Sequence, residues 1–169
     1  MNNARACDGC TLCCKVLSIA ALDKPQGQWC PNCVVGNSCK VYGTRPEECR
    51  TFSCSYLVDP KLDPAWEPRR SRIVLVCEAG SNRIVAHVDT SRPDAWRKAP
   101  YYAQLKAWSR QAVAARGQVV VYVGRRAVVI LPDRDVDLGL VADHEVIVTA
   151  GRMTPAGLRL EVYKAAREA

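Results

Sequence analysis

The stretch CDGCTLCC, residues 7–14, decides how the first third of this chain can fold. It contains overlapping Cys-x-x-Cys spacings, and its fourth cysteine follows the third directly. A Cys-x-x-Cys turn lets two thiolates converge on one metal ion. Neighbouring side chains diverge, however, so Cys13 and Cys14 fit poorly around a single tetrahedral ion. We therefore expect this stretch to supply thiolates to more than one ion.

The same residue type recurs over the next forty residues. Nine of the ten cysteines lie in the first 54 residues, where a second Cys-x-x-Cys pair precedes three single cysteines. Eight thiolates fill two separate four-coordinate zinc sites, and nine could fill a three-metal cluster with bridging sulfurs. Structural or disulfide-bonded cysteines do not usually come as repeated Cys-x-x-Cys pairs. The predicted metal ligands are Cys7, Cys10, Cys13, Cys14, Cys30, Cys33, Cys39, Cys49 and Cys54.

The composition is typical of a globular protein in a reducing compartment. Apolar residues make up 49% of the chain and charged residues 24%. No basic segment leads into an apolar one at the start, and no run approaches the ~18 apolar residues of a membrane span. We expect a cytoplasmic protein with no membrane segment, whose clustered cysteines bind metal or act in redox chemistry rather than form disulfides.

The chain divides into three parts. Residues 1–58 show little strand or helix periodicity and many glycines and prolines, which predicts an irregular, metal-stapled, cysteine-rich module. Residues 59–69, which begin DPKLDPAWEP with three prolines, predict an extended linker. Residues 70–169 predict an α+β domain.

Three hairpins and one helix are expected in the α+β domain. Strand-like runs SRIVLVCEA and NRIVAHVD flank Gly80-Ser81, QVVVYV and AVVILP flank Gly124, and HEVIVTA and LRLEVYKA flank a loop with Pro155 and Gly157. Between the first two hairpins, apolar residues recur at helical spacing from Tyr101 to Ala112, after Asp94 or Pro100 and before Gly117, the expected C′ residue. This order predicts a mostly antiparallel sheet with one main helix on one face.

In its cysteine-rich region the chain resembles the CxxCxxCC family of putative zinc- or iron-chelating cysteine-cluster proteins. The match comprises CDGCTLCC, then CPNC from Cys30, then CKVYGTRPEECRTFSC from Cys39, about a third of the chain. The resemblance implies eight chelating cysteines, with Cys33 a ninth found in only some members. It implies no established reaction.

Zinc is the favoured metal and an iron–sulfur cluster the alternative. The Cys7, Cys10 and Cys13 spacing copies the start of a bacterial ferredoxin motif, and Cys30-Pro31 copies its Cys-Pro pair. In the ferredoxin motif three residues separate the last two cysteines, whereas Cys14 follows Cys13 directly. All-thiolate ligands suit either metal.

Several polar residues beside the cysteines have ordinary explanations. Lys15 and Lys40 are expected in solvent, whereas Arg45 and Arg50 lie within the family-like pattern and are expected to be structural. Tyr42 and Phe52 are expected to pack in the small core of the module, and Trp96, Tyr101, Tyr102 and Trp108 in the core of the α+β domain rather than on bases. Arg69, Arg70 and Arg72 predict a solvated strand entry, with a phosphate-binding patch as the alternative.

Three further residues could carry chemistry outside the cluster. Cys77 alternates with apolar neighbours, which predicts a buried thiol. His87 shares a predicted strand face with Arg83 and Val85, and His144 is expected at a strand start. Each histidine could be a metal ligand or an acid–base group, but a purely structural place is the more ordinary expectation.

These features favour a metal-binding protein over an enzyme, because nine thiolates leave no obvious open coordination position. An iron–sulfur or thiol-redox protein is the first alternative, and a nucleic-acid-binding zinc module is the second. The net charge of +7 favours an acidic partner, but we expect only weak, non-specific binding to nucleic acid. The physiological role and any other partner are not predicted.

Overall fold

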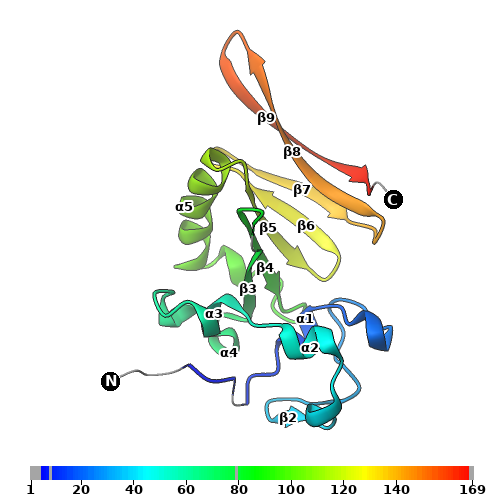
Figure 1. The fold of residues 1–169 in the computed structure, drawn as a ribbon. Helices are drawn as coiled ribbons and strands as arrows, with labels where there is room; N and C mark the ends of the chain where they lie inside the picture. Colours follow the sequence, from blue (N-terminus) through cyan, green and yellow to red (C-terminus); the bar gives the residue numbers. More distant parts are fainter. Residues whose placement is uncertain (1–4, 8, 79, 168–169) are drawn as a thin grey trace.

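A five-stranded sheet forms the centre of the fold (Figure 1). The computed structural model describes residues 5–7, 9–78 and 80–167. The strands lie in the order β3 (Ile73–Glu78), β4 (Arg83–Val88), β5 (Gln118–Val123), β6 (Arg126–Ile130) and β7 (Asp135–Leu140). A separate two-stranded hairpin follows, formed by β8 (Glu145–Thr154) and β9 (Gly157–Ala166). The expected α+β class and all three hairpins are confirmed.

The sheet differs from the expectation in two ways, because it contains one parallel pair of strands and one strand that was not expected. Strands β4 and β5 pair in parallel, since α5 (Tyr101–Ala114) connects them as a crossover helix. The other three neighbouring pairs are antiparallel, so the mostly antiparallel character holds. Strand β7 was not expected, because aspartates and a glycine alternate with its apolar residues at the sheet edge.

One face of the sheet packs against α5. Strand residues alternate between faces, so Ile73, Ala86 and Val121 point to the same side and join Leu105 of α5 in one buried cluster. The expected helical spacing is confirmed, because Leu105 and Ala112 are buried and Tyr101 and Trp108 pack against the same cluster. Trp96 and Tyr102 pack there too, as expected.

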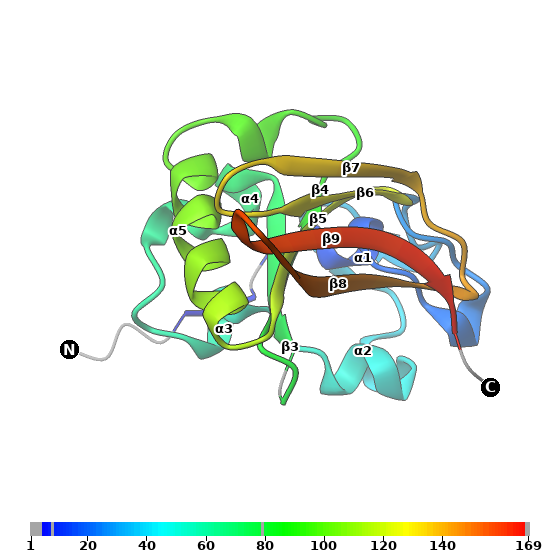
Figure 2. The ribbon, with the colours of Figure 1, turned by 90° about the horizontal axis from the view of Figure 1, so that it is seen from above.

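The opposite face is covered by two different parts of the chain. Over β3, Val74 is buried with Leu12, Val16 and Cys54 of the N-terminal segment. Over β5 and β6, Val120 and Val129 are buried with Ile147 of the β8–β9 hairpin. Figure 2 shows this hairpin crossing the sheet beside α5. The N-terminal segment therefore shares the core of the sheet.

The N-terminal segment is built of short pieces. Its elements are α1 (Cys13–Val16), η1 (Ala20–Leu22), β1 (Cys33–Val34), β2 (Ser38–Cys39), η2 (Tyr42–Thr44), α2 (Glu47–Thr51) and α3 (Ser55–Val58). Isolated helices of four or five residues do not hold themselves together in water. The order of this segment must therefore come from more than its own helices, and its packing on the sheet is one source.

The expected extended linker at residues 59–69 is wrong in conformation. It contains η3 (Pro64–Trp66) and the start of α4 (Pro68–Ser71). The Trp66 side chain is fully buried in the α5-side cluster, with its ring centroid 5.0 Å from those of Tyr101 and Trp108. The prolines predicted an extended chain, but Pro64 and Pro68 instead begin short helices, and the aromatic anchor between them was not predicted. The segment is part of the core.

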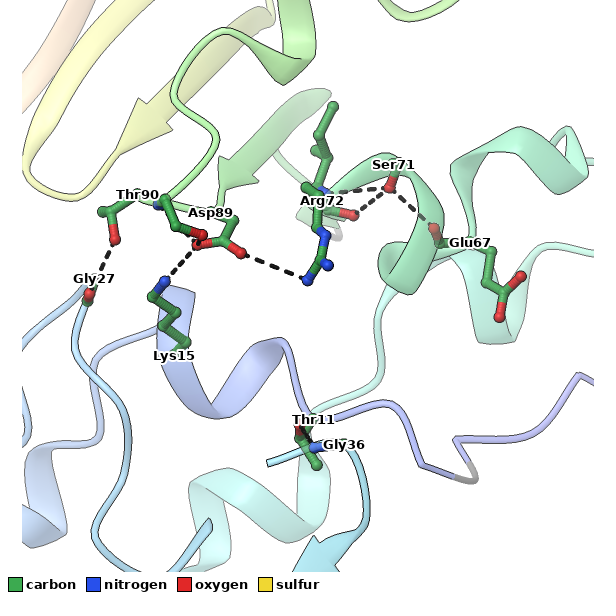
Figure 3. A network of polar contacts seen from close by, with 11 residues as sticks. Thr11, Lys15, Gly27, Gly36, Glu67, Ser71, Arg72, Asp89 and Thr90 are labelled. Carbon is green, nitrogen blue, oxygen red and sulfur yellow. Dashed lines mark hydrogen bonds and ion pairs between the residues drawn. The ribbon is translucent and has the colours of Figure 1, made fainter. Parts of the chain in front are cut away.

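A polar network also joins the N-terminal segment to the sheet (Figure 3). Lys15 of α1 donates to Asp89, just after β4, at 2.5 Å, and Arg72 approaches the other carboxylate oxygen at 3.8 Å. The Asp89 and Lys15 side chains are only 3% and 12% exposed, so the expectation of a solvated Lys15 is wrong. Next to them, Thr90 donates to the carbonyl of Gly27. A Cβ at Gly27 would lie 3.0 Å from the Thr90 methyl, and its φ of +83° also requires glycine.

Two further expectations of the sequence are corrected. The left-handed residue after α5 is Arg116, and Gly117 is needed for another reason, because a Cβ there would lie 2.0 Å from the Asn82 carbonyl oxygen. Cys77 is exposed rather than buried, because the last two residues of β3 are exposed to solvent. Within the described part of the chain, no helix has the length and apolar character needed to cross a membrane.

We expect Asp89→Asn to destabilise the protein by about 3 kcal/mol at pH 7, because it leaves the largely buried Lys15 ammonium without its carboxylate. Burial would raise the pKa of Asp89, but the hydrogen bonds from Lys15 and Ser91 outweigh burial and hold that pKa below 3.8. A depressed carboxyl pKa adds stability above 3.8 that is lost as the pH falls through the folded value. Urea unfolding should therefore show a deficit in the variant that shrinks below pH 4.

Asp94→Asn is the matched control, because Asp94 is 79% exposed and lies 4.0 Å from Arg97. Its stability should stay within ~0.5 kcal/mol of the wild type. Equal losses in both variants would contradict a special role for the Lys15–Asp89 pair.

Candidate metal centre

Most of the predicted ligands surround one cavity between the N-terminal segment and the sheet. Its volume is about 810 Å³. The cysteines on its wall are Cys7, Cys10, Cys13, Cys14, Cys30, Cys39 and Cys49. Seven thiol side chains from residues far apart in sequence therefore face a common space.

The remaining two predicted ligands lie just outside this wall. Cys33 and Cys14 are hydrogen-bonded through their thiols. Cys54, at the N-terminal end of α3, is 7% exposed and borders a much smaller pocket together with Cys7 and Cys10. All nine predicted residues thus lie in one region, whereas Cys77 lies outside it.

Five of these cysteines form a first group, and backbone pairing links four of them. The amide of Cys30 donates to the carbonyl of Cys14 at 3.0 Å, and Cys33 and Cys39 are opposite each other in the β1–β2 pair. Cys49 of α2 is close enough to Cys14, Cys30 and Cys39 for their charges to interact. We name Cys14, Cys30, Cys33, Cys39 and Cys49 the strand group.

The second group lies toward α3. The Cys10 amide donates to the Cys7 carbonyl at 3.0 Å, which closes the Cys-x-x-Cys turn. The charge on Cys54 acts on Cys10, and both side chains pack with Leu12 and Val74. We name Cys7, Cys10 and Cys54 the turn group. Cys13 packs beside the turn group but its thiol is hydrogen-bonded to Cys14, so it lies between the two groups.

Four of the thiols are shifted toward their protonated form, those of Cys10, Cys14, Cys33 and Cys49. Desolvation raises the pKa of Cys10, Cys33 and Cys49, and that of Cys33 reaches about 11. The pKa of Cys14 is raised first by its hydrogen bond with Cys13 and then by burial. Ionised thiolates in this space would need a strong positive charge, such as a metal ion, to balance them.

Lys24 is a buried cation on the border of the strand group. It is 5% exposed, and its ammonium donates to the carbonyls of Lys15 at 3.0 Å and of Leu17. A tight turn places it there, because Ile19 and Lys24 exchange backbone hydrogen bonds at 2.9 and 3.1 Å. Burial lowers the pKa of Lys24, and negative charge on Cys30, Cys14, Cys13 and Cys49 would raise it again. Sequence reasoning missed this residue, since nothing in its spacing marks it.

The other basic residues near the cysteines have mixed outcomes. Lys40 is exposed, as expected. Arg45 lies on the cavity wall with its guanidinium 3.9 Å from the ring centroid of Tyr42. Tyr42 is 63% exposed, so the expectation that it packs in a core is wrong; Phe52 does pack beside Val74, as expected. Arg50 is exposed, which gives the expected structural role no support.

The basic cluster of Arg69, Arg70 and Arg72 is partly neutralised and exposed to solvent. Arg69 and Arg70 pair with Glu67 at 3.0 and 3.3 Å, and Arg72 pairs with Asp89. These pairs reduce the charge that the cluster offers to a phosphate. The arrangement favours the solvated strand entry over the phosphate-binding alternative.

The two histidines have different surroundings. His87 of β4 lies on the cavity wall, on the predicted face with Val85 and Arg83. His144 is exposed just before β8. His87 is therefore the histidine placed beside the cysteines.

The cysteines surround the cavity without closing on a single point. Among residues 5–7, 9–78 and 80–167, no three His, Cys, Asp or Glu side chains form a group that could hold a metal ion as they stand. Ion binding here would require the short elements of the N-terminal segment to draw inward. No family model, curated protein or solved structure matches the chain.

If the cysteines bind a metal ion, Lys24→Met is expected to weaken that binding by about 10-fold or more. The substitution keeps the length of the side chain but removes a positive charge next to metal-bound thiolates, and ~1.4 kcal/mol of lost attraction is tenfold in affinity. Competition with a chelator of known affinity measures the change. Lys40→Met is the control, because Lys40 is exposed beside Cys39. Equal affinities of the two variants would show that the buried ammonium does not act on the bound thiolates.

Proposed function

We propose that residues 1–58 are a metal-binding module whose cysteine thiolates hold two or more ions, zinc before iron, in a mainly structural or chelating role. The observation that carries this proposal is the cavity lined by seven cysteines from four separate stretches of chain. Packing alone gives no reason for so many thiols to share one space. The resemblance to the CxxCxxCC proteins supports the same role.

The buried Lys24 supports an anionic occupant of this space. A buried ammonium group is costly unless a negative charge balances it. The charged groups that act on it most strongly are four cysteine thiols, and these carry negative charge only when deprotonated. A metal ion bound by four thiolates has net negative charge, so Lys24 and such a site would stabilise each other.

The two cysteine groups support at least two ions. The strand group and the turn group, with Cys13 and Cys14 at their junction, supply enough thiolates for two tetrahedral sites. The divergence of Cys13 and Cys14 then has a simple reason, since each would serve a different ion. Ligands drawn inward by an ion would order a segment that has few large apolar side chains.

The same module could hold an iron–sulfur cluster, which makes an electron-transfer or thiol-redox protein the alternative. The ferredoxin-like spacing of Cys7, Cys10 and Cys13 is the feature that favours it. A cytoplasmic location would keep the thiols reduced in either case. Weak, non-specific nucleic-acid binding stays a secondary proposal based on net charge.

Protein purified without oxygen and without added metal should contain at least two ions per chain, predominantly zinc. Elemental analysis identifies the metal and native mass spectrometry counts the ions. A brown preparation with visible charge-transfer absorption would select the iron–sulfur alternative. One ion or none per chain would contradict the proposal.

Single serine variants extend this measurement to the two groups. Cys39→Ser and Cys54→Ser should each lose about one ion, because each removes a ligand from a different group. Cys77→Ser should lose none, because that thiol is exposed and lies outside the cluster. If either Cys39→Ser or Cys54→Ser loses every ion, all the cysteines share a single cluster.

Removing the metal should disorder residues 1–58 while leaving the α+β domain folded, which also tests the proposed domain boundary. Hydrogen exchange after strong chelation under reducing conditions should be fast up to about Tyr56 and slow in VVVYV and AVVIL, residues 119–123 and 127–131. Strand β3 should lose some protection, since the module covers Val74. Uniform loss of protection along the chain would show that the sheet depends on the module.

A further inference from the structure

The sheet contributes two side chains to the wall of the cysteine cavity. They are Val76 of β3 and His87 of β4, whereas every cysteine on that wall comes from the first 49 residues. The cavity therefore brings an imidazole of the sheet together with thiols of the module. An ion bound by both would connect the two parts of the chain.

The imidazole of His87 is held firmly by its neighbours. Its ring is stacked on that of Tyr122 of β5, with centroids 5.7 Å apart and planes inclined by 12°. Its Nδ1 atom is 3.0 Å from the side-chain amide of Gln26, which belongs to the module. Strand β4 is paired on both sides, with Val74 and Tyr122 opposite His87. The ring is thus fixed in orientation, and Nε2 is its second polar atom.

We propose that His87 coordinates, through Nε2, one of the metal ions held by the cysteines. The inference rests on the proposed metal-binding function and adds a nitrogen ligand from the sheet to its all-sulfur set. Three thiolates and one imidazole form an ordinary tetrahedral zinc site.

The state of the ring suits this role. Burial, and next the positive charge of Arg83, lower the pKa of His87 to about 4, so the ring is neutral at physiological pH and keeps a lone pair on one nitrogen. Which nitrogen keeps it depends on Gln26. A half-turn of the Gln26 amide presents its oxygen to Nδ1, which then donates, and Nε2 keeps the lone pair. A second hydrogen bond from the other ring nitrogen is the usual way in which metal-bound histidines are oriented.

Other candidate ligands of oxygen or nitrogen are placed less well. Glu48 also lies on the cavity wall, but its side chain is exposed and one of its oxygens accepts a hydrogen bond from the Ala21 amide at 2.9 Å. His144 is exposed and does not belong to the cavity wall. His144 therefore provides a matched control.

X-ray absorption at the zinc edge tests the proposal on the full chain loaded with zinc alone. Wild type and His144→Asn should show the outer-shell scattering of one imidazole per chain, and His87→Asn should show sulfur scattering only. His87→Asn should also bind one of its ions at least about 10-fold more weakly, since even loss of an outer-shell partner has an effect of that size. Zinc bound with sulfur scattering alone in the wild type would overturn this inference and leave the proposed function standing. Wild type that binds no zinc would overturn both.

Nitrogen-15 spectra of the imidazole in the wild type keep the test decisive if His87→Asn does not fold. Metal-bound Nε2 carries no proton, whereas a histidine that only donates to a thiolate keeps its proton on Nε2. Gln26→Glu sharpens the comparison, because a carboxylate accepts and cannot donate, so Nδ1 must carry the proton. The imidazole scattering should persist in that variant. A protonated Nε2 in the zinc-loaded wild type would contradict coordination.

Discussion

The sheet has two apolar faces, and only one of them has a long helix to cover it. The α5 helix buries the face that contains Ile73 and Val121, but Val74 and Val120 on the opposite face need other cover. Exposed apolar strands are unfavourable by ~25 cal/mol for each Å² left in water, and they invite association. The chain covers this face from both of its ends. The N-terminal segment packs over β3, and the β8–β9 hairpin packs over β5 and β6.

That division explains why the cysteine region is attached as it is. A segment of four- and five-residue helices has little stability of its own, so it depends on the apolar contacts that Leu12, Val16 and Cys54 make with Val74. Polar contacts reinforce them, since Lys15 reaches Asp89 and the Gly27 carbonyl accepts from Thr90. The cavity lies beside these contacts, between the N-terminal segment and strands β3 and β4. Paired strands form the sheet side of its wall, and the short elements that carry the cysteines form the other side.

Local patterns predicted the elements of this fold but not their long-range partners. Period-2 runs around Gly80 and Gly124 gave hairpins, and helical spacing gave α5, because those signals act between near neighbours in the chain. Strand β7 was not predicted, because its aspartates interrupt the alternation of apolar and polar residues. The parallel pairing of β4 and β5 was not predicted either, because a single helix between two hairpins lacks the repeated βαβ pattern that indicates a parallel sheet. The candidate site divides in the same way. Cysteine spacing predicted which thiols gather, whereas the positions of Lys24 and His87 depend on tertiary contacts that no spacing records.

The position of the cavity has a consequence for what an ion could do there. An ion bound only by module cysteines would order the module, but it would leave the attachment to the sheet to the apolar cluster around Val74 and to polar contacts such as the Lys15–Asp89 pair. An ion that also bound His87 would connect the module directly to a strand paired on both sides. Because Gln26 belongs to the module and contacts the same ring, the attachment and the ligand geometry would then depend on each other. Metal occupancy would in that case set the stability of the second face of the sheet as well as the order of the cysteines.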